Sequence, residues 1–151
     1  MKIVIGSDHA GFKLKNAMGD VIRSLSHSVL DVGAFNENPS DYPDFAEAVG
    51  RAVLDGRAER GVLICGSGVG VSVAANKIKG IRAGVCHDTY SGHQGVEHDH
   101  MNVLVMGSRV IAEKLAEDII RAYLAANFTH EERHVRRLAK VQALEEKFGR
   151  P

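Results

Sequence analysis

The sequence is short of the features that mark several classes of protein. Its 151 residues include two cysteines, no tryptophan and only 5% aromatic residues, and 19 Lys and Arg residues balance 19 Asp and Glu residues. Zero formal net charge argues against a strongly basic surface that binds nucleic acid. No apolar run approaches the roughly 20 residues of a membrane-spanning helix, and the first residues, MKIVIGSDHAG, hold no long apolar signal core. Two cysteines do not make a disulfide framework, so we expect a protein of the reducing cytoplasm with no nucleic-acid or membrane partner.

What the sequence does contain is a regular alternation of short apolar runs and helical patterns. A chain of this length is expected to form one domain over residues 1–151. Short apolar runs predict strands over residues 1–5, 29–32, 61–65, 82–86 and 102–106. Helical spacing of apolar residues predicts helices over residues 12–25, 45–54, 71–77, 88–96, 112–124 and 131–148.

Strands that are apolar on both faces and separated by helices are typical of a parallel sheet covered on both sides. We therefore expect an α/β fold, a three-layer αβα sandwich with a five-stranded parallel sheet, Rossmann-like, plus a C-terminal helix. By analogy with doubly wound folds, the expected strand order is 2-1-3-4-5.

Polar side chains follow the predicted strands at their carboxyl ends, where open parallel sheets bind ligands. Asp8 and His9 follow the first strand, Cys65 closes the third, His87 and Asp88 follow the fourth, and Ser108 and Arg109 follow the fifth. Acid, imidazole, thiol, hydroxyl and guanidinium groups are thus expected along one edge. Their joint placement favours an active site over a plain scaffold.

A glycine-rich turn, CGSGVG, directly follows the third predicted strand. It lacks the Gly-Lys-Ser/Thr ending of a P-loop, and as a dinucleotide fingerprint it fails at Val71. It can also be an anion-binding nest, in which backbone N–H groups at the start of a helix stabilise a negative oxygen. Cys65 is then either a small buried residue or a thiol whose ionised form the turn favours.

Two other functions remain open on residue types alone. His87, His93, His98 and His100 lie within fourteen residues, with Asp88 and Asp99 nearby, a composition that could serve zinc or manganese, although no established ligand spacing is present. The chain could also be a non-catalytic module that binds a sugar phosphate or a nucleotide. Such a module predicts binding without turnover.

Five segments together resemble a known family: GSDHAG, DYPDFA, LICGSGVGVSVAANKIKGIRA, EHDHMNVLVMGSRVI and RHVRRL. In order and spacing they strongly resemble the type B ribose-5-phosphate isomerases, over nearly the whole chain. The wider family includes isomerases of allose, galactose and tetrose phosphates. The resemblance implies interconversion of ribose 5-phosphate and ribulose 5-phosphate through an enediolate, without metal or redox cofactor. It leaves another sugar phosphate open as the substrate.

The resemblance also implies roles for the turn. Cys65 is the base that removes the proton from C2. Some members lack this cysteine and carry a glutamate where this chain has Val71, so the chain resembles the cysteine type. The backbone N–H groups of the turn are expected to hold the enediolate oxygens, and Ser67 to add its hydroxyl. The backbone groups in question belong to Gly66, Gly68, Val69 and Gly70.

Further site residues follow from the same resemblance. His98 matches the general acid that opens the sugar ring, and Asp8 and His9 match positions that contact the substrate. Arginine forks suit phosphate oxygens. The arginines that match the phosphate side are Arg109, Arg133 and Arg137. Arg133 and Arg137 are four residues apart on a predicted helix and share a face, whereas Arg136 lies off that face.

Asp99 is the position at which the chain departs from the pattern, because many members have asparagine there. An ionised carboxylate only accepts hydrogen bonds, whereas an amide also donates. Asp99 is expected to contact a sugar hydroxyl or to orient His98, or else to be a bystander in a loop.

Members of the family are homodimers whose sites combine residues of both chains, so we expect the same here. The amphipathic segment 127–148 carries an apolar side that packs on its own domain or on a second copy.

Overall fold

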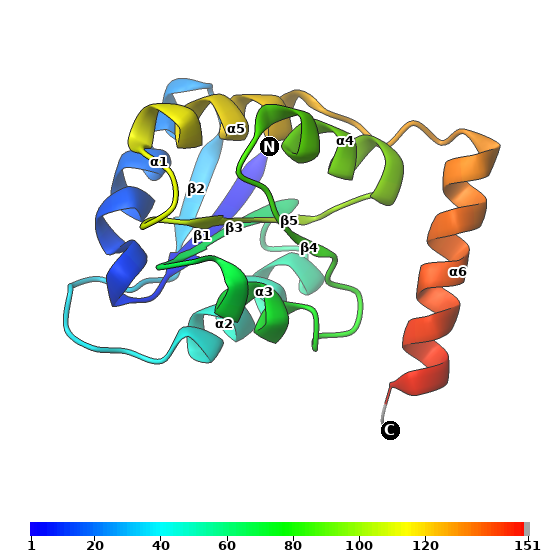
Figure 1. Ribbon diagram of the computed structural model, residues 1–151, viewed down its shortest axis with the longest axis horizontal. Coiled ribbons are helices and arrows are strands. Elements are labelled where there is room, and N and C mark those ends of the chain that lie inside the picture. Colours follow the sequence, from blue (N-terminus) through cyan, green and yellow to red (C-terminus); the bar gives the residue numbers. More distant parts are fainter. Residues whose placement is uncertain (150–151) are drawn as a thin grey trace.

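The computed structural model describes residues 1–149 and shows a five-stranded parallel sheet between two layers of helices (Figure 1). The strands are β1 (Lys2–Ser7), β2 (Ser28–Asp31), β3 (Arg60–Cys65), β4 (Ala83–Val85) and β5 (Val103–Gly107). The helices are α1 (Phe12–Ser24), α2 (Tyr42–Leu54), α3 (Val69–Ala75), α4 (Thr89–Asp99), α5 (Glu113–Ala125) and α6 (Glu132–Phe148), with a 3-10 turn η1 (His9–Gly11) after β1. The predicted fold class is confirmed.

Alternate residues of the strands serve two separate cores. Ile3 and Ile5 of β1 point into the core beneath α1, α4 and α5, while Val4 points into the core beneath α2 and α3. In Figure 1 these two groups of helices lie above and below the sheet. The sheet is therefore buried on both faces, which is why its strands read as continuous apolar runs.

The predicted strand order is wrong at one edge. The observed order is β2-β1-β3-β5-β4, so β5 and not β4 pairs with β3. All five residues of β5 are buried, whereas β4 has three residues that are partly or fully exposed. A short, half-exposed strand suits an edge, and the fully apolar one suits the interior.

Two helices near the predicted site differ from expectation at their ends. α3 begins at Val69, two residues earlier than predicted, because Gly68 takes a left-handed conformation with φ of 82° that starts the helix within the turn. α4 runs on to Asp99, so His98 and Asp99 lie in its last turn and not in a loop. Among the described residues, no helix is both long and apolar enough to cross a membrane.

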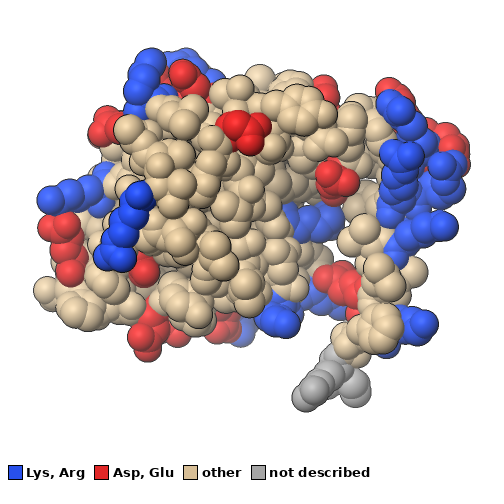
Figure 2. All heavy atoms as spheres, in the orientation of Figure 1, with Lys and Arg blue, Asp and Glu red and all other residues tan. Residues whose placement is uncertain are grey.

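The C-terminal helix α6 lies apart from the three layers, along the β4 edge (Figure 1). Glu145 accepts a hydrogen bond from the Gly80 N–H at 2.9 Å, which holds the far part of the helix to the domain. Its apolar side faces the domain across a groove instead of packing closely on it, and Val141, Leu144 and Phe148 remain 51%, 57% and 71% exposed. Figure 2 shows Lys and Arg side chains gathered over this end of the molecule.

Candidate active site

Cys65 is the last residue of β3, and its sulfur lies inside the glycine turn. The Gly68 N–H donates to Sγ at 3.1 Å, and the side chain is only 5% exposed. A hydrogen bond from a backbone N–H stabilises a thiolate. A side chain at position 68 would stand 3.1 Å from the Met106 carbonyl carbon, and φ is positive, so glycine is required there. The turn thus holds the thiol against a donor, as a reactive cysteine requires.

The end of β5 packs against this turn. The Ser108 N–H donates to the Cys65 carbonyl at 2.8 Å, and the Arg109 N–H donates to the Gly66 carbonyl at 2.9 Å. A Cβ on Gly107 would come within 2.5 Å of the Ser67 carbonyl oxygen, so the two segments are in direct backbone contact. This contact brings the Arg109 guanidinium to the turn, where its Nη1 would lie 3.3 Å from a Cβ at Gly66.

The end of β1 supplies Asp8 and His9 to the same place. Asp8 is 7% exposed, and its carboxylate accepts from the Gly11 N–H at 3.1 Å. His9 Nδ1 accepts from the Ser40 backbone N–H at 3.1 Å, and the His9 backbone N–H donates to the Ser40 hydroxyl at 3.0 Å. Because Nδ1 is an acceptor, the proton of a neutral His9 ring is on Nε2, which can donate to a ligand oxygen.

These three strand ends enclose a cavity of about 360 Å³. Seven of the predicted site residues line it: Asp8, His9, Cys65, Gly66, Ser67, Gly70 and Arg109. Gly68 and Val69 belong to the same turn, and the Val69 N–H donates to the Ser67 hydroxyl at 3.2 Å. The cavity combines a thiol, a carboxylate, an imidazole and a guanidinium, a set suited to proton transfer on an anionic substrate.

Tyr42 also lines this cavity, and the sequence analysis did not single it out. It is the first residue of α2, and its ring would lie 3.0 Å from a Cβ at Gly70. The segment DYPDFA that carries the family resemblance contains Tyr42, so the signal was present but was not assigned to a side chain.

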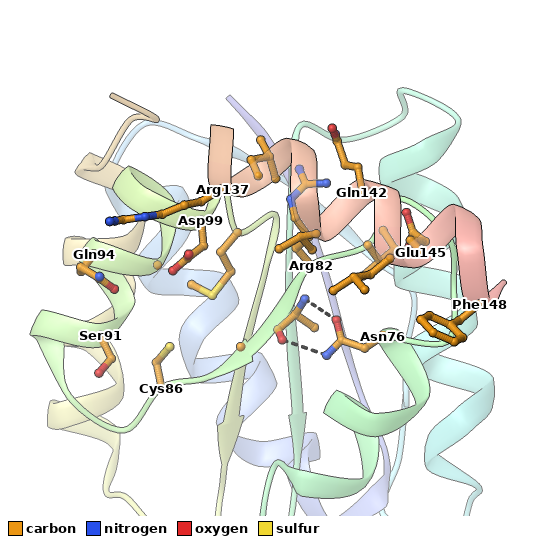
Figure 3. Close-up of a pocket in the computed structure, with 18 residues that line it drawn as sticks. Asn76, Arg82, Cys86, Ser91, Gln94, Asp99, Arg137, Gln142, Glu145 and Phe148 are labelled. Carbon is orange, nitrogen blue, oxygen red and sulfur yellow. Dashed lines mark hydrogen bonds between the residues drawn. The ribbon is translucent and has the colours of Figure 1, made fainter. Parts of the chain in front are cut away.

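The other predicted site residues form a second group on α4 and α6. Asp99 of α4 and Arg137 of α6 line the groove of about 780 Å³ between the domain and α6 (Figure 3). His98 lies in the last turn of α4, and Arg133 in the first turn of α6. The cavity at the strand ends and the groove beside α6 share no predicted site residue. One chain therefore carries the predicted site as two separate parts.

The histidine cluster is dispersed in the structure, and among the described residues no group of three or more His, Cys, Asp or Glu side chains is placed to hold a metal. His87 Nε2 accepts from the Gly107 N–H at 2.9 Å, His93 Nε2 lies 3.0 Å from Glu97, and His100 stacks on Phe128. Each ring thus has a partner within the protein, which gives the metal hypothesis no support.

The second cysteine contrasts with the first. Cys86 follows β4 and lines the α6 groove, where burial, with a smaller effect of Asp88, raises the pKa of its thiol to about 11. It is a protonated, unreactive thiol at neutral pH.

Comparison with known proteins settles the family. A family model described as Ribose/Galactose Isomerase matches residues 3–141. The chain belongs to the ribose/galactose isomerase family. Within this family, ribose-5-phosphate isomerase B of Escherichia coli is 41% identical over 146 residues, which is 97% of this chain and 97% of that protein.

Other members of the ribose/galactose isomerase family agree. The solved structure of ribose-5-phosphate isomerase B from Clostridium thermocellum superimposes with a TM-score of 0.95 at 42% identity, over 98% of this chain and 99% of that chain. D-erythrulose-4-phosphate isomerase of Pectobacterium atrosepticum is 42% identical over 130 residues, 85% of either chain. Relatives of nearly equal identity are thus named for phosphates of sugars of different length.

Proposed function

We propose that the protein is an aldose–ketose isomerase that interconverts ribose 5-phosphate and ribulose 5-phosphate. The observation that carries the proposal is the Cys65 sulfur in the glycine turn, facing a cavity that also holds a carboxylate, an imidazole and a guanidinium. Membership in the ribose/galactose isomerase family supports the reaction class. The proposed unit is one domain over residues 1–151 acting in the cytoplasm.

The proton-transfer step needs a base beside a site for negative oxygen. The Cys65 thiolate takes the proton from C2 of the open-chain aldose, which leaves an enediolate. The resulting thiol returns a proton to C1, and the proton of the O2 hydroxyl moves to O1, which gives the ketose. No electrons are gained or lost overall. Backbone N–H groups of the turn and the Ser67 hydroxyl stabilise the enediolate oxygens, where charge develops during the reaction.

The remaining groups of the cavity orient the substrate. Asp8 accepts from sugar hydroxyls, and the His9 Nε2–H donates to a substrate oxygen, since His9 Nδ1 is already occupied by Ser40. Arg109 supplies positive charge for the phosphate from the end of β5.

Ring opening and the remaining phosphate contacts require the second group of residues. We propose that His98, Asp99, Arg133 and Arg137 of a second copy complete the cavity, so that the active form is a homodimer with two shared sites. The separation of the two groups in one chain supports this. So does the open apolar groove beside α6, because exposed apolar surface of this kind marks interaction sites.

A coupled assay tests the reaction. Purified protein is given ribose 5-phosphate, allose 6-phosphate, galactose 6-phosphate or erythrose 4-phosphate, with and without a chelator. The expected result is the highest kcat/KM on ribose 5-phosphate and no effect of the chelator. Binding of these sugars without turnover would replace this proposal with the non-catalytic module.

A tetrose phosphate is the second candidate substrate. It is supported by the erythrulose-phosphate isomerase among the relatives and by Asp99, which replaces the common asparagine. Preference for erythrose 4-phosphate in the same assay would favour it.

Complementation between two defective variants tests the shared site. Cys65→Ala and His98→Asn should each be inactive. After the two are unfolded together and refolded, about half of the dimers are hybrids with one intact site, so about a quarter of wild-type activity should return. No recovery above the separate variants would mean that both residues act within one chain.

A further inference from the structure

His134 is a buried histidine that the proposed chemistry does not use. It lies in the first turns of α6, it is 1% exposed, and its ring stacks on that of His98 with centroids 4.1 Å apart and an interplanar angle of 26°. His134 Nδ1 is hydrogen-bonded to the Thr129 hydroxyl, and no described group partners the buried Nε2. A buried imidazole with one unpartnered nitrogen is costly to keep in a fold.

We propose that His134 is a positioning residue that holds the ring-opening His98 by its face. The inference rests on the proposed function, since His98 is the general acid only if the protein is the isomerase. It adds a residue that contacts the acid and not the substrate.

The stack fixes His98 from two sides. The Gln94 amide lies 2.8 Å from His98 Nδ1 within α4, and His134 covers one face of the ring from α6. With Nδ1 engaged, Nε2 is the nitrogen left to serve the substrate. His134 thus keeps His98 from turning away between catalytic cycles.

Burial, with a smaller contribution from nearby charges, keeps the His134 ring neutral. Burial lowers the pKa of His134, and the His98, Arg133 and Arg137 charges lower it further, against a smaller opposing effect of Glu131. His134 is thus the ring of the stacked pair that stays neutral at neutral pH. The neutral His134 ring then presents its π-face to an imidazolium, an attractive arrangement.

The charges that act on His134 come from His98 of α4 and from Arg133, Arg137 and Glu131 at the start of α6. Arg133 is paired with Glu131 at 3.1 Å, and Gln94 of α4 contacts His98 Nδ1. Because Arg133 and Arg137 flank His134 on one helix, the stack also sets where the phosphate arginines lie relative to the acid.

The test compares His134→Leu, which removes the aromatic face, with His134→Phe, which keeps it. For ribose 5-phosphate, the Leu variant should lose at least about tenfold in kcat/KM. The alkaline limb of its pH profile should move down by about half a pH unit, the shift expected from losing one neutral aromatic contact. The kcat/KM of the Phe variant should stay within about threefold of the wild-type value, and the alkaline limb of its pH profile should not move.

A measurement without substrate separates this inference from the proposed function. In an NMR titration of the histidine rings, the His98 midpoint should fall by about half a unit in the Leu variant and stay fixed in the Phe variant. His93→Leu is the matched control, because His93 lies on the same helix but does not stack on His98. If the Leu variant does not fold, His134→Asn removes the ring while its amide can still bond Thr129.

Several results would overturn the inference. One is a Leu variant whose profile and His98 midpoint superimpose on those of wild type, and another is a Phe variant as defective as Leu. An equal shift in His93→Leu would also do so. A wild-type protein without isomerase activity would remove the proposed function as well, whereas activity with an unmoved His98 would remove only this inference.

Discussion

Replacing Cys65 by alanine is the most direct perturbation of the proposed chemistry. Loss of a general base typically lowers the rate roughly 10²–10⁴-fold, which corresponds to about 3–5 kcal/mol of transition-state stabilisation. The sulfur touches the Gly68 N–H and is almost wholly buried, so its removal also leaves a small void. One buried heavy atom is worth about 1 kcal/mol of folding free energy. The fold should therefore persist while kcat collapses.

The assay measures kcat and KM for ribose 5-phosphate together with thermal unfolding. Cys86→Ala is the matched control, because Cys86 is equally buried and its thiol, with a pKa of about 11, is protonated at the pH of the assay. It should lose similar stability and keep kcat within about threefold. At pH 8 an iodoacetamide label should enter Cys65 first, since roughly one Cys86 thiol in a thousand is ionised there. A Cys65→Ala variant with more than about a tenth of wild-type kcat would refute the assignment of the base.

Substitutions at the phosphate side, at Asp99 and in the glycine turn test the other parts of the proposed site. Arg137→Ala should raise KM more than it lowers kcat, because a phosphate contact persists from the bound substrate to the transition state. The control is Arg136→Ala, which should change neither value, because the Arg136 side chain pairs with Glu132 of its own helix at 2.6 Å. A fall in kcat at constant KM for Arg137→Ala would contradict the proposed phosphate contact. Asp99→Asn should change the ratio of kcat/KM values on ribose 5-phosphate and erythrose 4-phosphate, because an amide can donate a hydrogen bond where an ionised carboxylate only accepts. Equal ratios in the two proteins would make Asp99 a bystander. Gly68→Ala should lower kcat at least about tenfold. The Gly68 φ of 82° is strained for alanine, and its new Cβ would lie 3.1 Å from the Met106 carbonyl carbon, so the glycine turn is forced away from the Cys65 sulfur. Unchanged kinetics would show that the turn does not stabilise the reacting oxygens.

The fold class was predictable because each strand is apolar on both faces, a pattern that only a sheet covered on two sides satisfies. The order of the last two strands was not. The segments 82–86 and 102–106 are both short and largely apolar. They differ in the structure because β4 is an edge strand, in which only three residues pair, and only with β5. That choice depends on contacts between segments distant in the chain, which local pattern does not record.

The site residues of the first group were predictable because they follow strand ends, and parallel strands bring those ends to one edge. Tyr42 was missed because it is the first residue of a helix and not the end of a strand, although its ring lies beside Gly70 in the cavity. His134 was missed because its buried stack on His98 joins two helices that the sequence gives no reason to pair.

The open groove beside α6 has a consequence for heat stability. If a second copy covers it, folding and association are linked, and mass action makes the melting temperature depend on protein concentration. Each tenfold increase in concentration then adds about 1.4 kcal/mol per mole of dimer to the folded side. A chain whose α6 groove stays open to water would melt at the same temperature at every concentration. In the proposed dimer, the exposed Val141, Leu144 and Phe148 would tie the thermal tolerance of the protein to its concentration in solution.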